Sequence, residues 1–226
     1  IPDTVTLANR NDNQMVQILS EALACNLYYE AVPLLASYVS RGVEAKNTID
    51  QPLLAGKYSA FIDGQYVGAG QVPVTATGQR LMLGFGVDPQ LRCRRELADK
   101  TGDKSWGNRV ETYKYNLIID NYKSAPVAIR LLDRIPVTKD KGLAITLKAS
   151  KDILATDADY RELDLPKGIL RWDITLPAST SGAKATKFAY SFDMKFDSDM
   201  QISTQGREIM EQLKQDVSDM QMRRSK

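Results

Sequence analysis

Histidine is absent from this 226-residue sequence, and it has only two cysteines and 8% aromatic residues. Without histidine, the chain cannot build a Ser-His-Asp or Cys-His triad, a histidine-bearing zinc site or a two-histidine iron site. It also lacks the side chain most often used as a general base near neutral pH. These absences predict a protein that is not an enzyme and that holds no cofactor or metal.

An excess of charge of one sign is also missing. The 30 basic and 28 acidic residues leave a formal net charge of +2, which is too small to predict a nucleic-acid or membrane-surface partner. No apolar run reaches 18 residues, so we expect no transmembrane segment in this chain. The sequence starts at Ile1 rather than Met, which predicts a processed product or an excised fragment whose targeting segment lies in the removed part.

The two cysteines, Cys25 and Cys93, are too few for a disulfide framework or a metal cluster. Each lies in a strand-like run, where a free cysteine behaves as a small buried hydrophobic residue. Whether the two form a disulfide is undecided by the sequence, because disulfide formation depends on the separation of their Cα atoms.

Alternation of apolar and polar residues with period two is the dominant pattern, and it predicts strands with one buried face. The alternating segments are residues 113–119, 127–131, 143–147, 170–176 and 188–196. Asp63-Gly64 predicts a two-residue hairpin turn, whereas residues 84–86 read as a strand end and residues 87–89 as a loop. The predicted fold is mainly β: an antiparallel β-sandwich with immunoglobulin-like elements, an accessory N-terminal sheet and a C-terminal amphipathic helix.

The predicted helix covers residues 206–222, where apolar residues recur at spacings of three and four. The apolar stripe consists of Met210, Leu213, Val217 and Met220. Two heptads are too short for an independent coiled coil. Either the stripe docks on the sheets or frays, or it is a partner or dimer helix through which the chain self-associates.

A domain boundary is predicted near Asn108, because the strands before it are irregular and those after it are long and regular. The expected organisation is an irregular β region with the Asp-Gly hairpin (1–108), an immunoglobulin-like region (109–200) and a helical tail (201–226).

A basic segment is the strongest candidate for a binding surface. Its candidate residues are Arg92, Arg94, Arg95, Trp106 and Arg109, a set that suits an anionic polymer or a sugar ring. Intermixed acidic residues weaken the positive electrostatic field of this segment. The alternative is that its charges only block aggregation, as charges on edge strands often do. The acidic segment 151–166 lacks the EF-hand order, so it reads as a solvated loop rather than a metal site.

Several motifs occur in an order that resembles one bacterial family. They are Leu53-Leu54-Ala55-Gly56, Phe61-Ile62-Asp63-Gly64-Gln65-Tyr66-Val67-Gly68, Leu83-Gly84-Phe85-Gly86-Val87-Asp88, Asp133-Arg134-Ile135-Pro136-Val137 and Gly168-Ile169-Leu170-Arg171-Trp172. Over roughly residues 28–196 the chain resembles the C-terminal domain, of unknown function, of mucoidy-inhibitor-A-like proteins. The resemblance implies a larger protein with a preceding β domain and coiled-coil segment, in an exopolysaccharide or cell-envelope setting, and it carries over no catalytic residues.

The favoured hypothesis is a non-enzymatic β-sandwich domain for protein–protein assembly or adhesion in a larger envelope-associated protein, periplasmic or extracellular. A carbohydrate- or anionic-polymer-binding module, with polysaccharide as the partner, is the first alternative. A hydrolase using paired carboxylates is the second, because the separation of the carboxyl groups defines such sites.

Overall fold

The structure is a computed structural model, and it describes residues 16–105, 107–150, 154–199 and 206–224. Most of its regular structure is strand, which confirms the mainly β prediction. The strands are β1 (Cys25–Ala31), β2 (Tyr38–Lys46), β3 (Gly56–Ile62), β4 (Gln65–Val72), β5 (Arg80–Ser105), β6 (Asn108–Asn121), β7 (Val127–Arg134), β8 (Leu143–Ser150), β9 (Ile169–Leu176) and β10 (Thr186–Asp197). Short helical turns occur at Tyr160–Asp164, Leu165–Lys167 and Gly182–Lys184, and α1 spans Gly206–Arg224.

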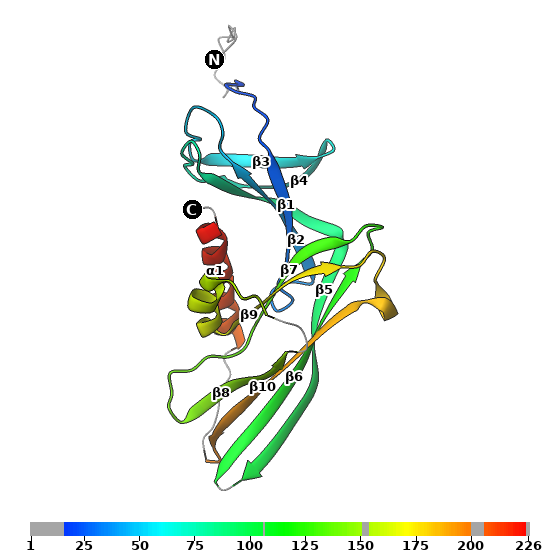
Figure 1. The fold of residues 1–226 in the computed structure, drawn as a ribbon, viewed down its shortest axis with the longest axis vertical. Coiled ribbons are helices and arrows are strands. Elements are labelled where there is room, and N and C mark those ends of the chain that lie inside the picture. The colour runs from blue at the N-terminus through cyan, green and yellow to red at the C-terminus, as the bar shows by residue number, and fades with distance from the viewer. Residues whose placement is uncertain (1–15, 106, 151–153, 200–205, 225–226) are drawn as a thin grey trace.

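Eight strands form one continuous mixed sheet in the order β8-β10-β6-β5-β2-β1-β7-β9. All neighbours are antiparallel except β1 and β7, which are parallel. The sequence predicted an antiparallel sandwich, and the immunoglobulin-like comparison stays a prediction. Figure 1 shows the long strands β5, β6 and β10 extending together toward one end of an elongated molecule.

The two ends of this sheet meet across the core, although β9 and β10 lie far apart in the strand order. Trp172 of β9 lies 6.0 Å from the ring of Tyr190 of β10, and its indole N–H donates to Ser150 Oγ of β8 at 3.1 Å. The alternating residues of β10 point into this core, as their period predicts. They are Phe188, Tyr190, Phe192, Met194 and Phe196, all buried.

The predicted boundary near Asn108 lies at the turn between the two longest strands of this sheet. β5 and β6 pair from Leu91↔Asn121 to Ser105↔Asn108. Buried residues from both sides of the boundary, such as Leu91 and Leu117, belong to one core cluster. The boundary therefore does not separate two cores in the part of the chain that the structure describes.

The predicted loop at residues 87–89 is wrong, because β5 continues through it. Gly86 has a φ of +69° and occupies a register irregularity between β5 and β2, so the chain bends there without ending the strand. Pro89 falls at a second irregularity, between the pairs Val39↔Asp88 and Tyr38↔Arg92. A proline is tolerated at such a position because no regular ladder hydrogen bond is required of it.

The Asp63-Gly64 hairpin is confirmed, and it forms a separate two-stranded sheet of β3 and β4. Both turn residues have positive φ, +49° and +76°, as a two-residue hairpin turn requires. This sheet approaches β5 closely at glycines: a Cβ at Gly86 would lie 2.0 Å from the Val67 carbonyl oxygen.

Helix α1 begins and ends inside the predicted tail, and it packs along the side of the sheet near β9 (Figure 1). Leu213, Val217 and Met220 are buried against Leu132 of β7 and Ile169 of β9. Arg134 and Lys167 both reach Asp216 on the helix, at 3.1 and 2.9 Å. No helix among the described residues is long and apolar enough to cross a membrane.

Candidate functional site

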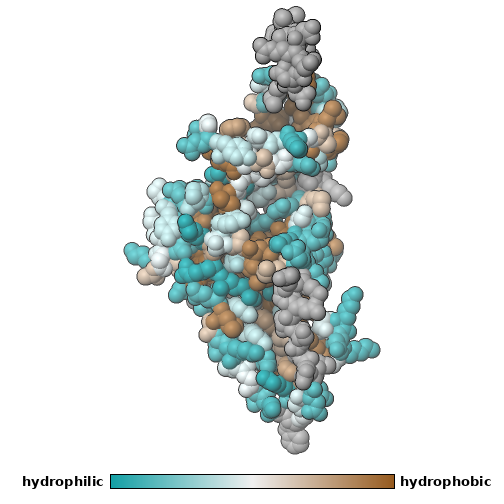
Figure 2. Space-filling view, turned by 180° about the vertical axis from the view of Figure 1, so that it is seen from behind, coloured by the Kyte–Doolittle hydropathy of each residue, from teal (hydrophilic) through white to brown (hydrophobic). Residues whose placement is uncertain are grey.

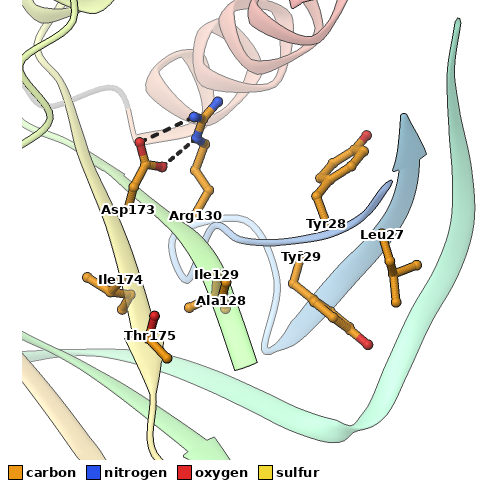
Figure 3. A pocket seen from close by; sticks show the side chains of 9 residues that line it. All are labelled: Leu27, Tyr28, Tyr29, Ala128, Ile129, Arg130, Asp173, Ile174 and Thr175. Atoms are coloured by element: carbon orange, nitrogen blue, oxygen red, sulfur yellow. Dashed lines mark hydrogen bonds and ion pairs between the residues drawn. The ribbon is translucent and has the colours of Figure 1, made fainter. Parts of the chain in front are cut away.

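The candidate site is an opening inside the main sheet, between β1 and β7. These parallel strands pair only at Glu30↔Arg130 and Ala31↔Leu131. Toward the N-terminal end of both strands, the ladder stops although each strand continues, β1 back to Cys25 and β7 back to Val127. The strands diverge there, as Figure 3 shows.

A cleft of about 340 Å³ lies in this opening. Its walls come from three strands: Leu27, Tyr28 and Tyr29 of β1, Ala128, Ile129 and Arg130 of β7, and Asp173, Ile174 and Thr175 of β9. The side chain of Leu27 reaches toward solvent and is 51% exposed. Apolar walls beside a backbone edge are typical of sites that receive an extended peptide.

The closed end of the cleft carries an ion pair. Arg130 donates from Nε and Nη2 to the two carboxylate oxygens of Asp173, at 2.8 and 3.3 Å, and Arg171 Nη2 lies 3.0 Å from the same carboxylate. Burial alone would raise the pKa of Asp173, but the hydrogen bond and charge of Arg130 outweigh it, and the pKa is lowered. The carboxylate is therefore ionised and occupied, which suits it to orient Arg130 rather than to transfer protons.

The second feature of the opening is the backbone edge of β7 that faces β1. Val127, Ala128 and Ile129 pair with β9 on one side, and the β1–β7 ladder does not extend to them on the other. Unpaired strand edges are templates for another strand, and proteins usually cover or charge them. Sequence reasoning missed this site; the one signal for it is the run of consecutive large apolar residues Leu27-Tyr28-Tyr29, which breaks the alternation of a strand with one solvent face.

The predicted binding arginines do not lie on one surface: Arg92, Arg94 and Arg95 alternate along β5, and Arg109 lies on β6. Arg94 points outward and pairs with Asp120 at 3.0 Å, whereas Arg95 points inward with Leu91 and Cys93. Arg92 is exposed, and Arg109 pairs with Glu111 at 2.7 Å. Trp106 lies outside the described residues, so the polymer-binding hypothesis stays a prediction.

Arg95 belongs instead to a buried polar network at the centre of the core. Its Nε donates to Asp133 Oδ2 at 2.9 Å, and Tyr190 donates its hydroxyl to the same oxygen at 2.7 Å. The guanidinium also lies 3.5 Å from the ring centroid of Tyr115. Burial raises the pKa of Asp133 even though Arg95 and Tyr190 act to lower it. With Asp133 fully buried, the network joins β5, β7 and β10 rather than facing a substrate.

The acidic segment 151–166 is structured where the structure describes it, from residue 154 onward. Asp157 pairs with Arg171 and Asp164 pairs with Arg223 of α1. Among the described residues, no group of three or more cysteines and carboxylates is placed to hold a metal ion. The segment thus holds β9 and the end of α1 in place.

The stripe proposed as a partner helix is divided in two. Leu213, Val217 and Met220 pack against the chain's own sheet, which is the docking alternative, while Met210 is 37% exposed.

Cys25 is exposed, Cys93 is buried, and neither forms a disulfide.

The fold and the opening define a β-rich domain with an interrupted strand ladder. The chain belongs to a family described as a domain of unknown function, DUF4139, whose model matches residues 1–195. It is also similar to Protein F37C4.5 of Caenorhabditis elegans, with 23% identity over 191 residues, covering 81% of this chain and 34% of the relative. The chain therefore spans about one third of the length of this curated relative. No solved structure matches it significantly.

Proposed function

We propose that this chain is a protein-interaction domain for assembly or adhesion within a larger protein, and that its β1–β7 opening receives an extended segment of the partner. One observation carries the proposal: Ala128 and Ile129 of β7 line a cleft on the side where the β1–β7 ladder does not reach them. An added strand would satisfy the β7 edge with main-chain hydrogen bonds, while the cleft walls select its side chains.

Exposed apolar groups elsewhere agree with an assembly role. Phe61 and Tyr66 flank the Asp63-Gly64 turn, form an edge-to-face pair at 5.7 Å, and are both exposed. Figure 2 shows apolar surface over the hairpin end of the molecule. Aromatic residues left on a surface are enriched at protein interfaces.

The setting is part of the proposal. The ordered motifs that resemble mucoidy-inhibitor-A-like proteins support a larger bacterial protein of the cell envelope, periplasmic or extracellular. The match to one third of a longer relative agrees with a domain that works inside a larger chain.

The test uses Cys25, which lies at the open end of β1. Cys25 is exposed, whereas burial raises the pKa of the Cys93 thiol to about 12, so a maleimide fluorophore labels Cys25 selectively. Phage-displayed 12-residue peptides would be selected on the unlabelled full chain, and the binding peptides titrated against the labelled protein. We expect a fluorescence change, together with slower amide hydrogen exchange at Val127–Ile129.

A matched pair of variants locates the binding. Leu27→Lys places a charge on the cleft wall, whereas Leu97→Lys makes the same change at a residue of similar exposure, 51% against 52%, on β5. Losing the apolar contact should weaken binding about tenfold or more in Leu27→Lys only. Peptides that bind both variants equally, or that leave exchange at Val127–Ile129 unchanged, would refute the proposal.

A further inference from the structure

A second, larger cleft of about 690 Å³ lies between the β3–β4 hairpin, the β2–β5 part of the main sheet and the last turns of α1. Its apolar walls include Val72, Pro73, Met82, Leu83 and Met222. The volume falls in the range of small-molecule sites, which are mostly apolar with a few placed polar groups. The proposed assembly function makes no use of this cleft.

Glycines form part of the cleft wall where β2 and β5 meet. Gly42, Gly84 and Gly86 line it, and the irregular register between β2 and β5 falls among them. A Cβ at Gly42 would lie 2.3 Å from the Tyr28 ring, and one at Gly86 would lie 2.0 Å from the Val67 carbonyl oxygen. The glycines therefore let these neighbouring groups pack against the backbone and so shape this wall of the cleft. The motif Leu83-Gly84-Phe85-Gly86-Val87-Asp88 is thus a wall of this cleft as well as a bend in β5.

Arg41 supplies the charged group of the cleft. Its side chain is half-buried, and its Nε donates to the Phe85 carbonyl at 3.3 Å. In the described part of the chain, no carboxylate forms an ion pair with it. The nearby Asp88 is already bound by Lys123, at 2.7 Å. Burial acts to raise the pKa of Asp88, but Lys123 and the charge of Arg41 lower it overall, so Asp88 is ionised.

We propose that this cleft binds a small amphipathic carboxylate, with the carboxylate on Arg41 and the apolar chain against Val72, Met82 and Met222. A guanidinium with unused donors in a partly desolvated site favours a planar, bidentate anion. The apolar walls favour a hydrocarbon body and disfavour an inorganic anion, which would leave them exposed to water.

The experiment follows methionine methyl groups of the full chain by NMR, using ¹³C-methyl methionine and decanoate as the probe. Met82 and Met222 line the cleft, while the buried Met194 lies in the main core and serves as an internal reference. Decanoate should shift the Met82 and Met222 signals in a saturable way and leave Met194 in place. Decyltrimethylammonium, with the same chain and the opposite charge, should bind at least about tenfold more weakly.

Variants separate charge from shape. Arg41→Gln should weaken decanoate binding about tenfold or more, whereas Arg80→Gln, an exposed arginine of β5 paired with Glu44, should not change it. Ser218→Trp should fill the cleft from α1 and abolish binding, while Lys214→Trp, one helical turn away and exposed, should not.

Unshifted Met82 and Met222 signals at saturating decanoate, or equal affinity in the wild-type chain and Arg41→Gln, would overturn the proposal. The circular dichroism spectrum of each variant confirms that a lost signal is not lost folding. The peptide titration at Cys25 is independent of these measurements, so the two proposals can fail separately.

Discussion

Replacing Arg95 by methionine removes the charge that faces the fully buried Asp133 and keeps an apolar side chain of similar length. Asp133 then retains its hydrogen bonds from the Tyr190 hydroxyl and from the Arg134 backbone N–H, at 2.7 and 2.8 Å, but has no cation beside it. Arg95→Met therefore removes one charge, together with the hydrogen bonds that it donates to Asp133 and Tyr190, at the place where β5, β7 and β10 meet.

Breaking a buried ion pair on one side costs about 3–5 kcal/mol, because the remaining charge is buried without compensation. That range includes the lost cation–π contact with Tyr115, because the Arg95 guanidinium makes both this contact and the ion pair with Asp133. Against a typical unfolding free energy of about 5–15 kcal/mol, this is a large fraction.

The penalty should depend on pH in a defined direction. Without Arg95, burial raises the pKa of Asp133 further above the unfolded value of about 3.9. The folded state then holds a proton that the unfolded state has released, so the variant loses stability as pH rises through the folded pKa. The difference from the wild-type protein should shrink between pH 7.5 and pH 4.5.

Urea denaturation at both pH values measures this difference, and a second variant tests its cause. Arg95→Met combined with Asp133→Asn removes both charges: the amide oxygen can still accept from the Arg134 N–H, and the amide NH2 can donate to the Tyr190 hydroxyl, which then acts as acceptor. The double variant should be about 2 kcal/mol more stable than Arg95→Met alone at pH 7.5. A double variant no more stable than the single one, or a penalty independent of pH, would refute the reasoning.

Three further outcomes are expected. Gly86→Ala should destabilise the protein by at least about 2 kcal/mol in thermal unfolding, since its φ is +69° and its Cβ site is blocked by backbone; Gly102→Ala, with no atom near its Cβ site, should change little. Iodoacetamide at pH 8 should modify Cys25 in the native protein and Cys93 only after denaturation, as mass spectrometry would show; native modification of Cys93 would contradict its burial. Leu213→Ala should lower the free energy of unfolding by about 2–5 kcal/mol and raise hydrogen exchange along α1 more than in β6. An equal rise in exchange in α1 and β6 would show that Leu213 does not specifically hold α1 on the sheet.

Local patterns predicted the strands well, because each strand buries one face and therefore alternates. The segment 188–196 lies within β10, and 170–176 lies within β9. The Asp63-Gly64 turn was predicted for the same kind of reason, since positive φ at both positions is a local demand. The sequence did not predict which strands pair, because the β9–β10 contact depends on the curvature of the whole sheet.

The candidate site could be predicted only in part. Alternation from Leu91 through Cys93 places Arg95 on the buried face of β5, so the predicted surface cluster of arginines is at odds with the pattern of its own strand. The opening beside Val127 has no such signature, because it arises where two strands distant in sequence diverge after two paired residues. The Leu27-Tyr28-Tyr29 run hints at it, without naming the strand on the other side.

The 26-residue strand β5 has a mechanical consequence. At about 3.3 Å per residue it extends roughly 85 Å along its path, pairing first with β2 and then with β6. The β3–β4 hairpin near one end and the main core near the other therefore both pack on β5. Local melting at either end removes hydrogen bonds from the strand that supports the other end, so we expect the elongated domain to unfold in one cooperative transition.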